Sequence, residues 1–198
     1  LIRVDFNVPL DENFEVTDNT RIVSAKPTII KVLEDGGSCI LMSHLGRPKG
    51  FQKDLTLEPI IEYLEEKYNV YVHFSNDCIS KESINTSRKM ISREIHLLEN
   101  LRFYKEELNN CDKFANKLSN HADIYINDAF GTSHRKHSSN NAILKYFDKK
   151  CLGHLMQKEI KYLKDFKFND KLTLIVGGAK ISSKVKMIYN FLGKAKNI

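Results

Sequence analysis

Arginine, histidine, aspartate and asparagine recur in this chain directly after short apolar runs. The fullest case follows the run 124–126, where a polar turn carries Asn127, Asp128, His134, Arg135 and His137. The same kinds of side chain follow three other apolar runs, at Asp5 and Asn7, at His44 and Arg47, and at Arg102. The planar guanidinium of arginine suits bidentate contact with carboxylate or phosphate. The spacing therefore predicts a site for an anion.

One such turn alone is more simply explained by exposure to solvent, and it is the recurrence that favours a site. In an open parallel sheet the carboxyl ends of the strands share one rim, so residues far apart in the chain become neighbours there. Arg21, near the start of a predicted helix, adds a further guanidinium. Crowded guanidiniums repel one another unless an anion lies between them. A small phosphorylated carboxylic acid is the predicted ligand, with its hydroxyl bound by Asp5 and Asn7.

A second candidate site lies at 176–184, which reads VGGAKISSK. Glycines allow the backbone to approach a phosphate, and Lys180 and Lys184 share one side of the first turn of a predicted helix. The stretch matches neither the P-loop nor the dinucleotide-binding pattern. An ordinary tight turn from strand to helix explains it equally well.

Other chemistries have weaker support. His134 and His137 could offer two nitrogens to a metal, but no acidic or cysteine partner lies at helical spacing, so no metal site is predicted. No G-x-S-x-G motif is present, which removes the commonest serine hydrolase. Duplex DNA fits the predicted rim poorly, because arginines on a concave surface cannot follow a long backbone.

The composition sets broad limits on the class of protein. The 198 residues are 41% hydrophobic and 28% charged, which is enough apolar material for a sizeable core, and no apolar run is long enough to cross a membrane. The net charge of +6 and the pI near 9.0 favour anionic partners in general and leave a nucleic-acid-binding domain as a further alternative. Four scattered cysteines predict buried thiols in a reducing cytoplasm. Since the first residue is Leu1 within a strand-like run, we expect a longer protein.

Apolar periodicity predicts alternating strands and helices. The predicted strands are 1–6, 38–43, 69–74, 95–98, 124–126 and 172–176. The predicted helices are 20–35, with a kink or late start at Pro27, 57–68, 112–118, 141–147, 155–168 and 182–192, and a short helix could follow Cys78 within the polar segment 77–93. This alternation predicts an α/β fold, a doubly wound, Rossmann-like parallel sheet with helices on both faces, followed by a truncated second α/β lobe.

Five stretches in this order resemble phosphoglycerate kinase. They are RVDFNVP at 3–9, SHLGRP at 43–48, LLENLRF at 97–103, NDAFGTSHRKH at 127–137 and GGAK at 177–180. Together they span nearly the whole chain. Two segments depart from the family pattern, the run SSNNAI at 138–143 and the unusually polar segment 80–93.

The resemblance implies two lobes, the first binding 3-phosphoglycerate and the second binding ADP or ATP with Mg²⁺. Residues 1–150 would form the substrate lobe, 151–169 the interlobe helix, and 170–198 the first βα unit of an incomplete nucleotide lobe. The residues expected to bind substrate are Asp5, Phe6, Asn7, Arg21, His44, Leu45, Gly46, Arg47, Arg102, His134 and Arg135.

The same resemblance assigns the residues closest to the reaction. Arg21 and Lys180 match side chains of the family that reach the transferring phosphoryl group, so they are the expected catalytic residues. The residues expected to bind nucleotide are Gly178, Ala179, Lys180 and Lys184. The later glycine-rich phosphate loop and the acidic residue that binds Mg²⁺ have no counterpart in this sequence.

The implied activity is that of a glycolytic phosphotransferase with a carboxyl group as acceptor, exchanging a phosphoryl group between 1,3-bisphosphoglycerate and ADP. We expect a cytoplasmic monomer with no membrane or nucleic-acid partner. The 198 residues alone are expected to bind 3-phosphoglycerate without turnover. The alternative from a different class is a catalytically inactive module that binds phosphorylated anions.

Overall fold

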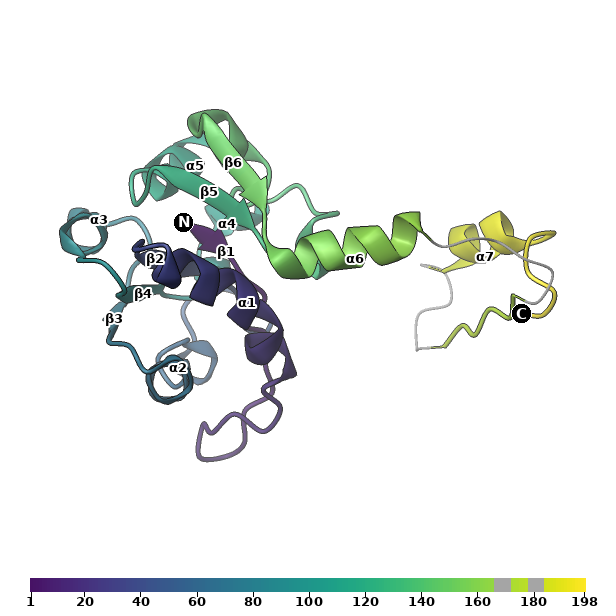
Figure 1. Cartoon of the computed structure of the whole chain (residues 1–198), viewed down its shortest axis with the longest axis horizontal. Coiled ribbons are helices and arrows are strands. Elements are labelled where there is room, and N and C mark those ends of the chain that lie inside the picture. The colour runs from purple at the N-terminus through teal and green to yellow at the C-terminus, as the bar shows by residue number, and fades with distance from the viewer. Residues whose placement is uncertain (166–171, 178–183) are drawn as a thin grey trace. The chain divides into compact units, whose positions relative to one another are not determined.

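A computed structural model describes residues 1–165, 172–177 and 184–198. The chain divides into two compact units, Leu1–Glu159 and Ile160–Ile198. The first unit carries a sheet flanked by helices, and it contains every residue of the predicted anion site (Figure 1). The predicted boundaries at 150 and 170 remain predictions.

The sheet of the first unit has six strands in the order β3-β4-β2-β1-β5-β6, and every neighbouring pair is parallel (Figure 1). The strands are β1 (Ile2–Arg3), β2 (Cys39–Met42), β3 (Val72–Ser75), β4 (Ile95–Leu98), β5 (Ile124–Asn127) and β6 (Lys149–Leu152). Ile2 pairs with Leu41 on one side and with Ile126 on the other, which makes β1 central. The strand order therefore reverses beside β1, where doubly wound sheets bind their ligands.

Helices cover both faces of this sheet. They are α1 (Thr20–Glu34), α2 (Ile60–Tyr68), α3 (Lys81–Lys89), α4 (Lys105–Leu108) and α5 (Asp112–Ser119), with 3₁₀ turns η1 (Lys53–Leu55), η2 (Leu101–Phe103), η3 (Phe130–Thr132) and η4 (Ala142–Tyr146). Successive side chains of a strand point to opposite faces. Accordingly Leu41 packs in a core cluster with α1 and α2, and Met42 packs with α5 and η4. The predicted doubly wound α/β fold is confirmed.

Several element boundaries differ from the predictions. The helix predicted from Leu57 begins at Ile60, because Thr56 and Leu57 donate their hydroxyl and N–H to the Glu99 carboxylate. α1 begins at Thr20 and contains Pro27, so the late start is not found. The short helix considered after Cys78 is found as α3, whose first turn is capped by Ser80 accepting from the Ser83 N–H. β6 was not predicted, and its four residues are exposed and rich in lysine, which hides the strand pattern.

The second unit contains fewer regular elements. α6 (His154–Lys164) begins in the first unit and ends in the second, and the predicted end of that helix at Phe168 lies outside the described residues. Of the strand predicted at 172–176, only an isolated bridge between Thr173 and Asn197 is found. α7 spans Val185–Phe191. Among the described residues no helix has the length and apolar character to cross a bilayer.

Candidate anion-binding site

The carboxyl ends of β2, β4 and β5 bring three predicted arginines together. Arg47, Arg102 and Arg135 line one cavity of about 380 Å³, with Pro48 and Leu108 completing its wall. Their positions lie far apart in the chain, and they meet because the three strands run in parallel and end at the same rim. Three of the four guanidiniums predicted to converge therefore line this cavity, and Arg21 is not among its lining residues.

The cavity is strongly electropositive. Burial and the neighbouring charges of Arg135, Arg3 and Arg47, in that order, together lower the pKa of Arg102 to about 10, while Asp5 acts in the opposite direction. The Arg102 Nη1 donates to the Gly46 carbonyl, a neutral partner. Burial and neighbouring positive charges both destabilise the charged form of a guanidinium. An anion placed among the three arginines would therefore stabilise all of them.

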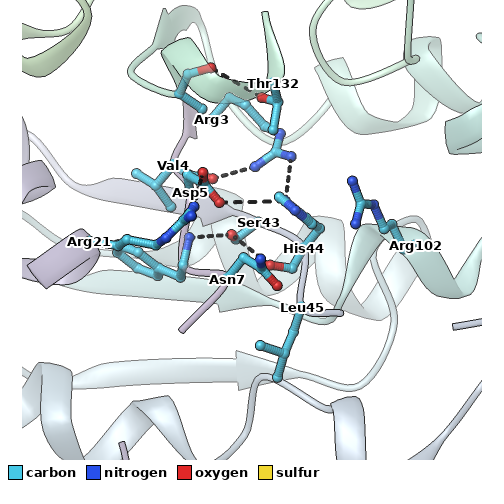
Figure 2. A network of polar contacts seen from close by, with 12 residues as sticks. Arg3, Val4, Asp5, Asn7, Arg21, Ser43, His44, Leu45, Arg102 and Thr132 are labelled. Carbon is cyan, nitrogen blue, oxygen red and sulfur yellow. Dashed lines mark hydrogen bonds and ion pairs between the residues drawn. The ribbon is translucent and has the colours of Figure 1, made fainter. Parts of the chain in front are cut away.

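Asp5 follows β1, and its charge acts on Arg102 of the cavity. One of its oxygens, Oδ2, pairs with Arg21 from the first turn of α1, as Figure 2 shows. Its other oxygen, Oδ1, is buried and has no hydrogen-bond partner among the described residues, and the same is true of the Arg135 Nε. A buried polar atom without a partner is costly. The site therefore offers one free acceptor and one free donor, the set that a ligand with a hydroxyl and an anionic group would satisfy.

His44 follows β2 and is buried behind the arginines. Its Nδ1 lies 3.1 Å from the Arg3 Nη2 and 3.8 Å from the Asp5 Oδ1 (Figure 2). Burial lowers the pKa of His44 to about 2, and the charges of Arg3, Arg102, Arg135 and Arg21 act in the same direction. His44 is therefore neutral at physiological pH and contributes hydrogen-bonding capacity without charge.

Two loops hold the arginines in place. The Asn7 Oδ1 accepts from the Gly46 N–H at 2.8 Å, which ties the β1 loop to the β2 loop. Gly46 has φ +61°, and a Cβ there would lie 2.8 Å from Leu55, so only glycine fits without strain. The Asn100 Nδ2 donates to the carbonyls of Leu45 and Leu55, and its Oδ1 accepts from the Arg102 N–H. These contacts set the position of Arg102.

Of the eleven predicted substrate-binding residues, the ones that line the arginine cavity are Arg47, Arg102 and Arg135. The side chains of Phe6 and Leu45 are buried in the hydrophobic core, and the Phe6 N–H donates to Ser43 Oγ at 2.8 Å. His134 is exposed, and it is absent from the lining of the arginine cavity. For Phe6 and Leu45 only the backbone faces the loops of the site, so their assigned role remains a prediction.

Sequence reasoning missed Arg3 and Glu107. Arg3 is fully buried within β1, and Glu107 in α4 is 1% exposed. The Arg3 Nε donates to Ser139 Oγ at 3.2 Å, and Ser139 donates its hydroxyl and N–H to the two oxygens of Glu107. The available signal was a charged residue within an apolar run, since a buried arginine requires a buried acceptor.

The predicted nucleotide site is largely outside the described residues. Gly178, Ala179 and Lys180 all fall there, and Lys184 is described at the N-cap of α7. Over the described ranges, no three His, Cys, Asp or Glu side chains are grouped so that they could hold a metal ion. His137, half of the weak zinc pattern, lies 3.7 Å from the Glu107 carboxylate instead.

Comparison with known proteins gives a consistent family. The family model described as "Phosphoglycerate kinase" matches residues 1–198. The chain is 45% identical over 201 residues to a phosphoglycerate kinase of Chlorobium phaeobacteroides, covering 100% of this chain and 51% of that protein. It is 47% identical over 195 residues to a cytosolic phosphoglycerate kinase of Nicotiana tabacum, covering 98% and 49%.

Solved structures show the same relationship. Phosphoglycerate kinase from Coxiella burnetii superimposes with a TM-score of 0.81 at 33% identity, covering 98% of this chain and 49% of that one. The enzyme from Pyrococcus horikoshii gives a TM-score of 0.87 at 29% identity, covering 98% and 50%. The chain spans about half the length of the relatives that it matches.

Proposed function

The chain belongs to the phosphoglycerate kinase family, and from this premise we propose that it binds 3-phosphoglycerate or 1,3-bisphosphoglycerate at the arginine cavity. The observation that carries the proposal is the meeting of Arg47, Arg102 and Arg135 around one cavity, beside an unpartnered carboxylate oxygen of Asp5. Three cations suit a ligand with phosphate and carboxylate groups. The free Asp5 Oδ1 suits its hydroxyl.

The complete protein is proposed to transfer a phosphoryl group between 1,3-bisphosphoglycerate and ADP. In the direction that consumes ATP, the nucleophile is the carboxylate of 3-phosphoglycerate, which is already ionised at neutral pH, so no general base is needed. Catalysis then consists of positioning and of neutralising charge on the phosphoryl oxygens. Arg21, half exposed at the edge of the site and paired with Asp5, is suited to reach that group.

The nucleotide is proposed to bind with Mg²⁺ through the second lobe. Lys180 and Lys184, with the backbone of Gly178 and Ala179, would contact its phosphates, and Mg²⁺ would enter with the nucleotide. This assignment is supported by the family match across 1–198 and by the GGAK stretch. The remainder of this lobe is proposed to lie in the half of the family's length that this chain does not span.

A chain limited to residues 1–198 is proposed to bind 3-phosphoglycerate without transferring phosphate. The test combines isothermal titration with 3-phosphoglycerate and a coupled assay of ATP consumption. Saturable heat without ATP consumption is the expected result. ATP consumption would show that these residues suffice for turnover, and absence of binding would refute the assignment of the cavity.

The second candidate is a binding module without catalysis, in which the arginine cavity holds a phosphorylated anion and no transfer follows. The same coupled assay on a protein that includes the remaining half of the family's length separates the two functions. Turnover there supports the kinase, and binding without turnover supports the module. A cytoplasmic monomer without a nucleic-acid partner remains our proposal, and the relatives include both cytosolic and chloroplastic proteins.

A further inference from the structure

The contacts of the His44 ring define which of its nitrogens carries a proton. Arg3 Nη2 lies 3.1 Å from His44 Nδ1, and a guanidinium has donors only. Nδ1 must therefore accept this hydrogen bond through its lone pair. The Asp5 Oδ1, at 3.8 Å from the same atom, is too distant to receive a proton from it. A neutral imidazole that accepts at Nδ1 carries its proton at Nε2.

The Nε2–H of His44 is free to bind a ligand. Among the described residues no hydrogen-bond partner is found for this nitrogen, although the side chain is only 5% exposed. The cations around the ring, Arg3, Arg102, Arg135 and Arg21, oppose a second proton. His44 therefore presents one neutral donor, and its acceptor side is already occupied by Arg3.

Arg3 is itself held in one orientation. Its Nη1 donates to the carbonyls of Val4 and Met42, and its Nε donates to Ser139 Oγ. Ser139 is anchored by two hydrogen bonds to Glu107, at 2.6 Å and 2.9 Å. The four side chains of this network are Arg3 of β1, Glu107 of α4, His44 of the loop after β2 and Ser139 of the loop after β5. Burial raises the pKa of Glu107, and the charge of Arg3 opposes that rise most strongly. Glu107 and Arg3 stabilise each other in the core.

We propose that Arg3 is a positioning residue that, supported by Ser139 and Glu107, fixes the tautomer of His44 so that the ring directs its Nε2–H to the bound anion. This inference rests on the proposed function for the identity of the anion. Arg3 does not touch the ligand in this arrangement. It acts by making His44 a donor of fixed direction, which reduces the reorganisation needed when phosphoglycerate binds.

The direct test is the protonation state of each imidazole in the ligand-free 198-residue chain. Long-range ¹H–¹⁵N correlation spectra of the labelled protein report which ring nitrogen is protonated, and His44→Gln identifies the His44 signals. His121 serves as an internal reference, because its Nε2 lies 2.9 Å from the Cys78 carbonyl and must donate to it. We expect His44 to show the same tautomer as His121 across pH 5.5 to 8.

Two variants separate the role of Arg3 from that of its support. In Arg3→Met/Glu107→Gln the donor to Nδ1 is removed and no buried charge is left unpaired, so His44 should lose its single tautomer. The single variant Glu107→Gln retains Arg3, so His44 should keep its single tautomer. Affinity for 3-phosphoglycerate, measured by titration calorimetry, should be roughly tenfold weaker in the double variant than in Glu107→Gln, the effect of one lost hydrogen bond.

A proton on His44 Nδ1 in the unmodified chain would overturn the proposal, as would equal tautomers and affinities in the two variants. If the double variant does not fold, the spectrum of the unmodified chain decides alone. Failure of 3-phosphoglycerate to bind the unmodified chain would refute the proposed function, and the ligand-free spectrum would still decide the tautomer. Binding with His44 protonated at Nδ1 would refute only the role of Arg3.

Discussion

At the scale of single residues, the site combines cations that have partners with cations that have none. Arg21 is paired with Asp5, and Arg3 is linked to Glu107 through Ser139. Arg47 and Arg135, in contrast, line the cavity without an ion pair among the described residues. The guanidiniums of Arg47 and Arg135 are therefore available to a ligand. Those of Arg21 and Arg3 are engaged within the protein and hold the surroundings of the site in place.

Replacing Arg47 or Arg135 by alanine should weaken binding of 3-phosphoglycerate and leave the fold intact. A charge-assisted hydrogen bond contributes roughly 1.5 to 3 kcal/mol, so the dissociation constant should rise roughly 10- to 150-fold in each variant. Titration calorimetry gives the affinity and circular dichroism the fold. Arg88→Ala is the matched control, because Arg88 lies on α3, pairs with Asp123 and does not line the cavity. Unchanged affinity in both site variants would contradict the assignment.

At the scale of elements, the loop that carries Arg135 is joined to the start of α6. Asp128 follows β5, and its Oδ1 accepts from the Met156 N–H at 3.1 Å, in the first turn of α6. The His154 N–H donates to Thr28 Oγ1 of α1 at 2.8 Å. These acceptors satisfy helix N–H groups that have no partner inside the helix. The first turn of α6 is therefore anchored to both β5 and α1.

Gly153 makes this anchor possible, so Gly153→Ala should be destabilising. A Cβ at this position would lie 2.2 Å from the Asp128 Oδ1, and Asp128 would have to leave its place as the cap. Loss of a helix cap together with strain in a packed site should reduce the free energy of unfolding by about 1–3 kcal/mol. Urea unfolding measures it.

Gly131→Ala is the control for that measurement. Its Cβ would meet only the Asp5 Oδ2 at 3.5 Å, an ordinary contact, and it lies in the same unit. We expect its unfolding midpoint to stay close to that of the unmodified chain. Equal midpoints for the two alanine variants would show that Asp128 does not depend on Gly153.

At the scale of the whole first unit, buried histidines form a second polar network away from the arginine cavity. His121 donates from Nε2 to the Cys78 carbonyl, so its Nδ1 accepts from the Ser87 hydroxyl at 2.6 Å. Ser87 then accepts from His96 Nδ1 at 2.7 Å, and His96 Nε2 accepts from Ser75 at 2.8 Å. Each link has one direction only while both imidazoles are neutral. Burial lowers the pKa of His96 to about 3 and of His121 to about 4.

The unit should therefore lose stability as the pH falls below about 6.5. Both histidines have a lower pKa when folded than the unfolded value of about 6.5, so the unfolded state binds more protons, and stability decreases until the pH approaches the folded pKa values. Near pH 5, where each histidine is protonated in the unfolded state and neutral in the folded state, each should contribute a loss approaching about 1.4 kcal/mol per pH unit. Denaturant unfolding at fixed ionic strength across pH 4.5 to 8 measures the slope.

His96→Gln should show a shallower pH dependence, because one titrating group is removed. Between pH 7 and 8 the two proteins should have parallel stability curves, since these imidazoles are neutral in both states. The same slope in both proteins below pH 6 would mean that His96 does not carry the acid sensitivity.

The sequence predicted much of the strand and helix arrangement, but it predicted less of the buried polar contacts within it. Alternating apolar runs predicted β1 to β5 with α1, α2 and α5, because burial on both faces of a parallel sheet leaves a clear pattern. In the polar sequence between them, α3 was only a possibility and α4 was not predicted. β6 was not predicted, because its exposed lysines show no apolar pattern. The strand expected at 172–176 had the pattern, yet only Thr173 is bridged, since a strand also needs a partner.

The sequence by itself determined the fold class and placed a basic or hydrogen-bonding residue at four strand ends, since both follow from local periodicity and residue chemistry. Only the tertiary structure decided which of those cations are free. Arg3 lies next to Ser139 although 136 positions separate them, and Glu107 completes that pairing from α4. A buried charge must find a partner, but its partner is set by the folding of the whole chain around it, and no local spacing records that choice.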